Sequence, residues 1–398
     1  MFAGQYSSRA KKTQNSELAA LFKLTENPEV ISFAGGFPDP DWYLDEIIEI
    51  TEKVIREKKG AALSYGPTPG LSDLREYLAA RLELQGIAAK GADVLITAGS
   101  LQGLDIVGRI FLDPGDRVIV EAPTYIGAIA TLQSLEAVLV QVPIDELGMQ
   151  TDLLEDVLKG MNRDSQLPKF IYTIPNFQNP SGCTLSLERR RQLLRVAACY
   201  GIPVIEDNAY GELRFAGKEL PLLKALDTED LVIHLGTFSK IFSPGLRLGW
   251  LVARPELVEK AILFKQGTDQ CSNTLGQLLA LEYGRRGYID KQVEVSAKSL
   301  IAKKDAALNA LQEYFPAGST WTLPEGGFYT WVTLPQTVNT VDILPVAVRD
   351  YQVAYVAGPS FHADRSGANK LRLCYSNPKI AQIAGGIEKL ARALTVCT

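Results

Sequence analysis

Lys240 stands where lysines are uncommon. It lies between two apolar runs, residues 231–235 and 248–252, that have the composition of buried strands, whereas lysine side chains usually lie in water. Ser239 and Arg247 flank it, and their hydroxyl and guanidinium groups are suited to binding phosphate. A lysine that partial burial makes nucleophilic, beside phosphate-binding groups, is suited to forming an imine with a phosphorylated aldehyde.

A second candidate phosphate site follows another apolar run. Ser100, Leu101 and Gln102 come at the start of an expected helix that continues over residues 104–111. Free N–H groups at a helix N-terminus bind phosphate, and the helix dipole strengthens the attraction. Ser100 is also a good N-cap residue, so the turn alone is equally typical of a helix that starts without a ligand.

Four more side chains of interest lie in or just after apolar runs. Asp207 could keep a pyridine nitrogen protonated, and Asn179, in an Asn-Pro-Ser-Gly turn, could donate a hydrogen bond to a phenolate oxygen. Tyr125 could stack on a planar ring, and Arg372 could bind a carboxylate through two hydrogen bonds. Each has an ordinary alternative: a helix cap, a turn, a surface arginine or a core tyrosine.

The combination is more specific than any of its members. A phosphate cradle, a stacking ring, an amide, an acid and a lysine follow one another along the chain, each close to a strand-like run. Ligands of α/β sheets gather at the carboxyl ends of the strands. One cofactor, pyridoxal 5′-phosphate, needs all five groups, so the set predicts a site for it.

The composition narrows the classes of function. The chain has 398 residues, 46% apolar and 22% charged, and its net charge of −5 offers no basic field for nucleic acid. No apolar run approaches the ~20 residues of a membrane span, and the N-terminus lacks the apolar core of a signal peptide. Five scattered cysteines without a CxxC pair, and only two histidines, favour neither disulfides nor a metal site. We therefore expect a cytoplasmic protein.

Apolar runs alternate with amphipathic helical stretches, such as residues 151–161 and 187–200. Most of the runs are rich in Val, Ile and Leu without clean alternation, as expected for strands buried on both faces. The pattern predicts an α/β fold in which a mostly parallel, seven-stranded sheet lies between helices. The expected strands are residues 93–97, 117–121, 138–142, 169–174, 203–207, 231–235 and 248–252.

The pattern changes after about residue 290. A long charged helix over residues 291–314 is followed by short strands and a last helix from about residue 379. This predicts a smaller α+β domain. The expected short strands are residues 328–333, 353–356 and 370–375. We expect an N-terminal segment, 1–50, that joins the small domain, a large cofactor-binding domain, 51–290, and the small domain itself, 291–398.

Several strings of residues, taken together, resemble a known family. They are ISFAGG at residues 31–36, YGPTPG at 65–70, and the strings around Asn179, Asp207 and Lys240. In this order they resemble the fold-type I, class I aminotransferases that depend on pyridoxal phosphate. The resemblance spans nearly the whole chain and is closest to the α-aminoadipate/kynurenine aminotransferase group.

The resemblance implies a role for each matching residue. Lys240 would form the internal aldimine and then act as base and acid, Asp207 would pair with the pyridinium nitrogen, and Tyr210 would act with them at the ring oxygen. Tyr65 would reach into the partner subunit's site, which implies a homodimer with shared active sites. The cofactor-binding set would be Tyr65, Ser100, Leu101, Gln102, Tyr125, Asn179, Asp207, Tyr210, Ser239, Lys240 and Arg247. The α-carboxylate of the substrate would contact Gly36, Asn179 and Arg372.

The resemblance also implies a reaction. An amino acid gives its α-amino group to the cofactor, and a 2-oxo acid, expected to be 2-oxoglutarate, takes it back in a ping-pong sequence. Some members carry an arginine in the first helix that pairs with a distal substrate carboxylate, but residues 16–22 here contain no basic side chain. We therefore expect a broad, neutral or aromatic donor. The alternatives are a 2-aminoadipate-type transaminase, a lyase or decarboxylase on the same fold, and, more remotely, a module of a transcriptional regulator.

Overall fold

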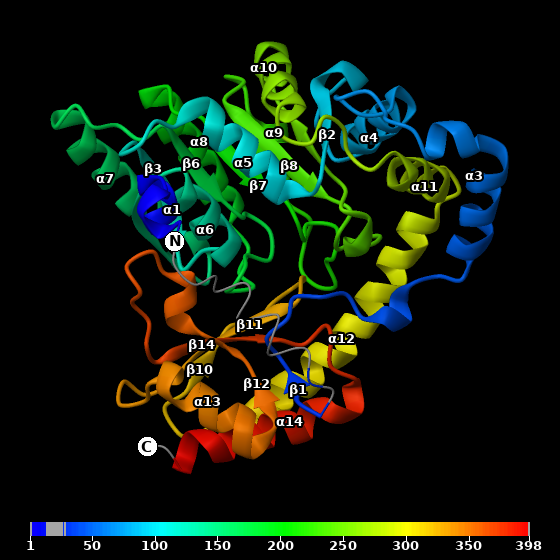
Figure 1. Ribbon diagram of the computed structural model, residues 1–398. Helices are drawn as coiled ribbons and strands as arrows, with labels where there is room; N and C mark the ends of the chain where they lie inside the picture. Colours follow the sequence, from blue (N-terminus) through cyan, green and yellow to red (C-terminus); the bar gives the residue numbers. More distant parts are fainter. Residues whose placement is uncertain (1, 13–26, 28, 397–398) are drawn as a thin grey trace.

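The computed structural model describes residues 2–12, 27 and 29–396. Two lobes are visible in Figure 1. The larger lobe, in the upper half of the view, is built on one twisted sheet with helices around it. The smaller lobe below contains the C-terminal strands and helices together with a strand from near the N-terminus.

Eight strands form the sheet of the large lobe, in the order β2-β9-β8-β7-β6-β3-β4-β5. The strands from β8 to β4 are parallel, whereas β9 is antiparallel to both β2 and β8. All seven predicted strands are present, and β5 is a two-residue addition, antiparallel to β4, that the sequence did not predict. The bounds are β2 (Val94–Thr97), β3 (Arg117–Ala122), β4 (Val138–Asp145), β5 (Gly148–Met149), β6 (Phe170–Thr173), β7 (Val204–Asp207), β8 (Val232–Thr237) and β9 (Gly249–Val252).

Successive residues of the central strands pack into two different apolar clusters. Val118 and Val120 of β3 belong to one cluster, while Ile119 belongs to the other. The sheet is therefore buried on both faces, which explains why its strands are continuously apolar. The first cluster includes helices α5 (Ser100–Phe111), α6 (Ile126–Ser134) and α10 (Pro255–Gln266). The second includes α7 (Thr151–Arg163), α8 (Leu187–Tyr200) and α9 (Leu223–Leu226).

Three further helices pack together at the β2 edge of the sheet (Figure 1). They are α3 (Glu46–Ala62), α4 (Ser72–Leu84) and α11 (Thr274–Arg285). Shorter helical turns are α1 (Ser8–Lys12), η1 (Ala3–Gln5), η2 (Pro40–Trp42), η3 (Gly91–Asp93), η4 (Pro244–Leu246) and η5 (Gly358–Phe361). No helix in the described part of the chain is both long and apolar enough to cross a membrane.

The small lobe contains a four-stranded antiparallel sheet in the order β10-β11-β14-β13 and a separate parallel pair, β1-β12. The predicted strand at residues 353–356 is wrong as one strand, because β12 pairs with β1 while β13 pairs with β14. The chain changes sheets at the buried Tyr355. The bounds are β1 (Ile31–Ser32), β10 (Thr320–Trp321), β11 (Tyr329–Thr333), β12 (Val353–Ala354), β13 (Val356–Ala357) and β14 (Lys370–Cys374).

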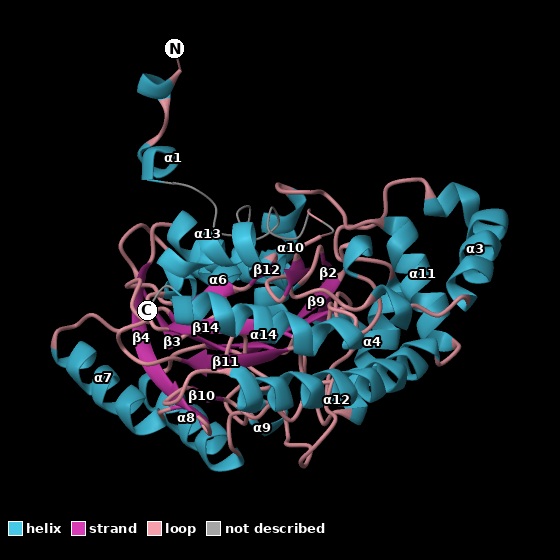
Figure 2. Ribbon diagram, turned by 90° about the horizontal axis from the view of Figure 1, so that it is seen from below, coloured by secondary structure: helices cyan, strands magenta, loops and turns pink. Residues whose placement is uncertain are grey.

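Three helices complete the small lobe, and Figure 2 shows α12 and α14 running across it. They are α12 (Tyr288–Tyr314), α13 (Thr340–Tyr351) and α14 (Ile380–Val396). The long helix α12 starts in the large lobe, where Gln292 donates to the Phe242 carbonyl at 2.7 Å. Farther along, Lys303 donates to the Ser376 carbonyl at 2.7 Å and to Asp39. The domain boundaries expected near residues 50 and 290 fall inside α3 and α12, and division at these positions stays a prediction.

Candidate active site

A cavity of about 610 Å³ lies at the carboxyl ends of the central strands, between the two lobes. We call it the lysine cavity. All but two of the predicted site residues line it. They are Gly36, Ser100, Leu101, Tyr125, Asn179, Asp207, Tyr210, Ser239, Lys240, Arg247 and Arg372. The structure thus brings together residues from widely separated parts of the sequence.

Lys240 lies in the turn between β8 and η4, three residues beyond the last residue of β8. Its Nζ donates to the carbonyl of Gly36 at 2.8 Å and lies 5.8 Å from the ring centres of both Tyr210 and Phe328. Burial lowers the pKa of the Lys240 ammonium to about 8, and the nearby Arg372 guanidinium contributes in the same direction. A minor fraction of this amine is therefore already neutral near pH 7, far more than for an ordinary lysine, and can act as a nucleophile and as a base.

Asp207 is the last residue of β7 and is buried. Its Oδ2 accepts a hydrogen bond of 2.8 Å from the Tyr172 hydroxyl, while its buried Oδ1 has no partner of good hydrogen-bond geometry in the described chain, although the Ser100 hydroxyl is close enough to help lower the pKa. Burial raises the pKa of Asp207 to about 6, and the bond from Tyr172 opposes that rise. A buried carboxylate oxygen without a partner, at the wall of a cavity, is suited to accept from a cationic N–H.

Two tyrosines from different lobes meet at the cavity wall. The hydroxyls of Tyr210 and Tyr329 lie 2.9 Å apart, and their rings are arranged edge to face. Burial is the first cause that raises the pKa of Tyr210 well above its usual value, so this hydroxyl keeps its proton. Tyr329 also limits the space around Gly36, because a Cβ on that glycine would lie 2.0 Å from the Tyr329 hydroxyl.

Arg372, on β14, is buried and held on several sides. Its Nη1 donates to Asn179 Oδ1 at 2.8 Å, and its Nη2 donates to the Ala34 carbonyl. The guanidinium carbon lies 4.3 Å from the ring centre of Tyr329 and 4.9 Å from that of Phe361. Its Nε is buried and has no partner among the described residues. This preorganised cation retains donor capacity for a carboxylate.

The turn before α5 has the geometry of an anion site. Ser100 is the first residue of α5, and the N-cap is Gly99, so the expectation that Ser100 caps the helix is wrong. Gly99 has φ +102, which glycine adopts without strain, and a Cβ there would lie 3.1 Å from Nη2 of Arg247. The start of α5, Arg247 and Ser239 therefore surround one corner of the cavity.

Two predicted residues lie outside the cavity lining. The side chain of Gln102 accepts from the Ala98 amide at 2.7 Å and donates to Asp269 at 2.8 Å, so both its oxygen and its nitrogen have partners outside the cavity. Tyr65 is 83% exposed on the surface of this subunit. The first-helix stretch at residues 16–22 lies outside the described residues.

Sequence reasoning missed Tyr172 and Tyr329 as site residues. Both lie inside strands that the sequence did predict, where an aromatic residue is ordinarily interpreted as core. Tyr125 lines the cavity, as its predicted place beside the cofactor ring requires. Burial raises the pKa of its hydroxyl to about 12. The Asp207 contact of Tyr172 follows from the parallel pairing of β6 with β7, which no short motif records.

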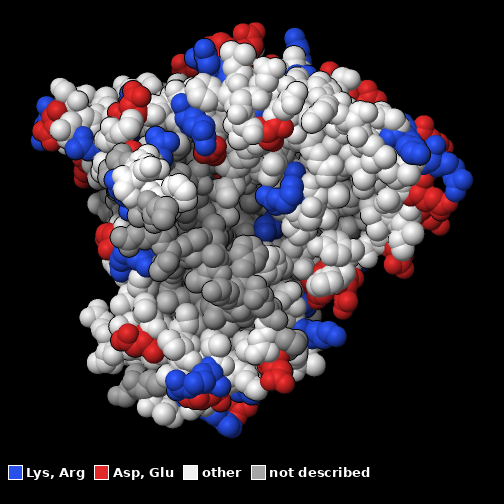
Figure 3. Space-filling model, viewed as in Figure 1, with Lys and Arg blue, Asp and Glu red and all other residues white. Residues whose placement is uncertain are grey.

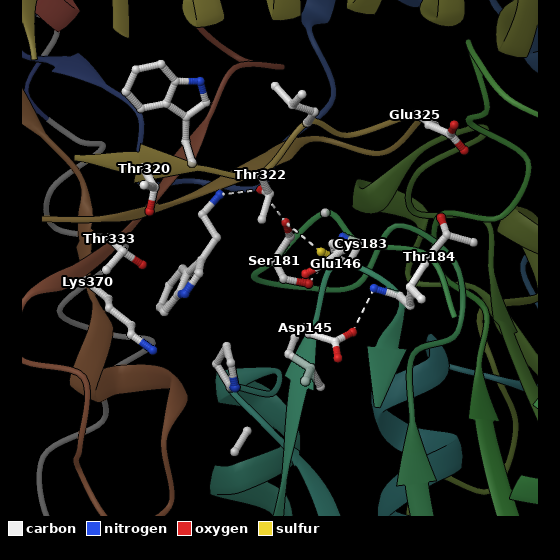
Figure 4. A pocket seen from close by; sticks show the side chains of 18 of the residues that line it. Asp145, Glu146, Ser181, Cys183, Thr184, Thr320, Thr322, Glu325, Thr333 and Lys370 are labelled. Atoms are coloured by element: carbon white, nitrogen blue, oxygen red, sulfur yellow. Dashed lines mark hydrogen bonds between the residues drawn. The ribbon is translucent and has the colours of Figure 1, made fainter. Parts of the chain in front are cut away.

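A second cavity, of about 650 Å³, lies near the loop that follows Asn179 (Figure 4). It includes Ser181 and Cys183 of that loop together with Thr322 and Lys370 of the small lobe. Thr322 bridges the lobes there by donating to the Ser181 carbonyl at 2.6 Å. Neither Lys240 nor Asp207 lines this second cavity, so we assign the chemistry to the lysine cavity.

Two further observations concern metal ions and nucleic acids. Among the described residues, no cluster of His, Cys, Asp and Glu is arranged to hold a metal ion. On the face displayed in Figure 3, acidic and basic side chains are interspersed over both lobes, and basic side chains lie in the hollow between them. This face carries no extended patch of a single sign, in contrast to a nucleic-acid surface.

Comparisons with known proteins agree with this geometry. Residues 28–390 match the sequence model of a family described as aminotransferase class I and II. The chain is 42% identical to aromatic-amino-acid aminotransferase 1 of Thermococcus litoralis, covering 98% of this chain and 94% of that protein. It is 39% identical to the 2-aminoadipate transaminase of Thermus thermophilus, covering 97% and 95%.

A solved structure is also similar. The kynurenine aminotransferase of Pyrococcus horikoshii, in complex with PMP, superposes with a TM-score of 0.94 at 41% identity, covering 98% of this chain and 97% of that one. The predicted fold type is confirmed by this similarity and by the family match.

Proposed function

We propose a donor class and a set of residue roles for this chain, which belongs to the class I and II aminotransferase family. It is an aminotransferase that depends on pyridoxal phosphate. Its substrates are amino acids and 2-oxo acids. The family match covers residues 28–390, which includes nearly all of the described chain and every residue of the lysine cavity.

The residues of the lysine cavity fit the cofactor. The free Oδ1 of Asp207 would accept from the protonated pyridine nitrogen, and Lys240 would hold the aldehyde carbon covalently. The start of α5 with Ser239 and Arg247 would hold the phosphate, and Tyr125 would cover one ring face. When bound, the cofactor supplies an electron sink that stabilises negative charge at the substrate α-carbon.

Proton transfer is assigned to Lys240. Its amine has a pKa of about 8, so near neutral pH it can take a proton from the substrate and return it. In the absence of a ligand, the hydrogen bond to the Gly36 carbonyl holds Nζ at the cavity wall. Asn179 and Tyr210 are proposed to hydrogen-bond the phenolic oxygen of the ring, and Tyr329 fixes the Tyr210 hydroxyl at 2.9 Å.

Binding of the substrate α-carboxylate is assigned to Arg372, supported by Asn179 and the Gly36 backbone. The stacking of Tyr329 and Phe361 on the guanidinium fixes its plane before the substrate arrives. A fixed cation loses little entropy when it binds a carboxylate, and it excludes substrates that lack one.

The donor is proposed to be neutral or aromatic, and one observation carries this. The cations among the described residues that line the cavity are Lys240, Arg247 and Arg372, and each already has a role. The remaining wall includes Phe37, Leu101, Ile126 and Ile174. A distal carboxylate would meet no further cation among these residues, whereas an aromatic or branched side chain would bury its apolar surface. The proposed acceptor 2-oxoglutarate meets the same wall with its second carboxylate, so we expect it to be used with a high KM.

The test is a panel of half-reactions followed by the absorbance of the bound cofactor. We expect kcat/KM for phenylalanine and leucine to equal or exceed that for 2-aminoadipate, with 2-oxoglutarate as the returning acceptor. Lys240→Ala serves as the control that must lose the half-reaction. A clear preference for 2-aminoadipate would overturn the donor assignment in favour of a 2-aminoadipate transaminase, the second candidate suggested by a 39% identical relative.

The protein is proposed to act as a homodimer whose subunits share their active sites. Tyr65 is 83% exposed, and Leu63, two residues before it, is 65% exposed. Two large apolar side chains exposed so close together in the sequence support an interface there. We also propose a cytoplasmic location, supported by the described cysteines, all of which are unpaired.

A further inference from the structure

A lysine of helix α10 is completely buried. Lys265 has no exposed surface, and its Nζ donates to both carboxylate oxygens of Asp269, at 2.6 and 2.7 Å. Burial lowers the pKa of this ammonium, and the bonds to Asp269 oppose the shift. Buried lysines are rare because the removal of their charge from water is costly. The contacts of this buried ion pair therefore indicate its role.

The ion pair continues into the start of helix α5. Asp269 Oδ2 accepts from Gln102 Nε2 at 2.8 Å, and Gln102 Oε1 accepts from the amide of Ala98 at 2.7 Å. The carbonyl of Ala98 in turn accepts from Nη2 of Arg247 at 2.9 Å. A continuous series of hydrogen bonds thus links the buried lysine to the arginine that lines the cavity.

We infer that Lys265, Asp269 and Gln102 form a relay that positions the phosphate cradle from behind. The inference rests on the proposed placement of the cofactor phosphate between the start of α5 and Arg247. The relay fixes the turn at Ala98 by its amide and fixes Arg247 through the carbonyl of the same residue. None of the three relay residues lines the cavity, so they are positioning residues and do not touch the cofactor.

The relay has an electrostatic consequence as well. The side chain of Gln102 separates Asp269 from the proposed phosphate site. Without a cation beside it, the Asp269 carboxylate would repel a phosphate bound there. Lys265 neutralises that carboxylate. Gln102, held by Asp269, still orients the turn through its hydrogen bond from the Ala98 amide. Because water screens partly buried charges poorly, removal of the Lys265 charge should weaken the binding of phosphate at the cradle.

The experiment measures affinity for anions by the protein without its cofactor. Titration calorimetry would give the dissociation constants for pyridoxamine phosphate, which forms no covalent bond to the protein, and for inorganic phosphate. Lys265→Met keeps the volume and removes the charge, and we expect it to weaken both ligands by about tenfold or more. Lys260→Met, on the exposed side of the same helix, is the matched control and should change neither.

Further variants separate positioning from general stability. Gln102→Leu keeps the ion pair and should weaken both ligands by about threefold or more, so the relay remains testable if Lys265→Met does not fold. Adding Asp269→Asn to Lys265→Met removes the unpaired carboxylate and should restore part of the lost affinity. If both single variants lower the melting temperature but bind both ligands as tightly as the unaltered protein, the relay is only structural and the inference is wrong.

A failure of the proposed function would look different. Arg247→Met should itself weaken phosphate binding, because Arg247 is proposed to contact that group. If phosphate binds equally well without Arg247, the cradle is misplaced, and the site assignment falls together with the relay. If Arg247→Met weakens binding while the relay variants do not, the cradle stands and only the relay is overturned.

Discussion

Lys240 is the residue whose chemistry depends most on its surroundings. Burial lowers its pKa to about 8, so the neutral amine is present above that pH and is lost below it. We predict that the rate at which the cofactor-free protein captures pyridoxal phosphate rises about tenfold per pH unit up to about pH 8 and then levels off. Stopped-flow absorbance measures this rate. A rate that keeps climbing towards pH 10, as for an exposed lysine, would contradict the burial.

The Tyr210–Tyr329 pair supplies a second prediction at this scale. Tyr329→Phe removes the hydroxyl that lies 2.9 Å from Tyr210, and we expect kcat/KM to fall about fivefold, the equivalent of one hydrogen bond of about 1 kcal/mol. Steady-state kinetics would also show a non-additive effect with Tyr210→Phe, because both changes break the same contact.

A matched control for this pair exists outside the cavity. Tyr283 donates to Gln292 at 2.8 Å and is buried, so Tyr283→Phe should lower stability without changing kcat/KM. Equal kinetic losses in Tyr283→Phe and Tyr329→Phe would show that the loss reflects stability rather than the active site.

Residue types and strand ends predicted most of the site. Lys240, Asp207 and Asn179 could be located because each follows or ends a recognisable element, and the carboxyl ends of parallel strands converge. Arg372 could be located because it interrupts the apolar part of an expected strand. The side chain of Gln102 could not be predicted, because its partner Asp269 lies far away in the sequence and only the packing of α10 against α5 brings them together.

At the scale of elements, the loop after β6 depends on one buried arginine. Arg190 of α8 donates to the carbonyls of Leu185, Pro175 and Pro221 and to Asn176 Oδ1. Three of these acceptors, at residues 175, 176 and 185, bracket the loop that carries Asn179, and each would lose a hydrogen bond without the guanidinium. Burial lowers the pKa of Arg190 to about 10, so it remains charged at neutral pH.

We predict that Arg190→Met lowers the free energy of unfolding by about 3 kcal/mol, because several buried acceptors lose their donor. Chemical denaturation measures this change. The neighbouring Arg191 is exposed, so Arg191→Met should stay within about 0.5 kcal/mol of the unaltered protein. Similar losses in both variants would show that Arg190 does not hold the loop.

The elements themselves were predicted unevenly, for physical reasons. The seven long strands and helices α7 and α8 were found because burial on two faces and helical periodicity leave strong patterns. Strand β5 and the break between β12 and β13 were missed. Each of these strands has only two residues, too few for any periodicity to show.

At the scale of the whole molecule, the shared site can be tested by complementation. If Tyr65 serves the partner subunit's site, a Tyr65→Phe variant and a Lys240→Ala variant should regain activity when their subunits are exchanged. We expect on the order of a quarter of the unaltered activity, because half of the randomly formed dimers are mixed and each has one complete site. No recovery, in samples shown to be mixed by native mass spectrometry, would contradict the shared site.

The helix α12 determines how the two lobes can move. Its 27 residues span about 40 Å, and it contains neither Pro nor Gly, the residues at which helices most often bend. Gln292 attaches it to one lobe and Lys303 to the other. We therefore expect the small lobe to rotate about the axis of α12 rather than to move away from the large lobe. Spin labels at the exposed Leu84 and Val341 would report a swivel as a change in distance between lobes, while labels placed along α12 would keep theirs. Such a rotation would move the small-lobe residues at the cavity entrance relative to Lys240, which belongs to the large lobe. The shape of the entrance would then select substrates while the position of Lys240 stays unchanged.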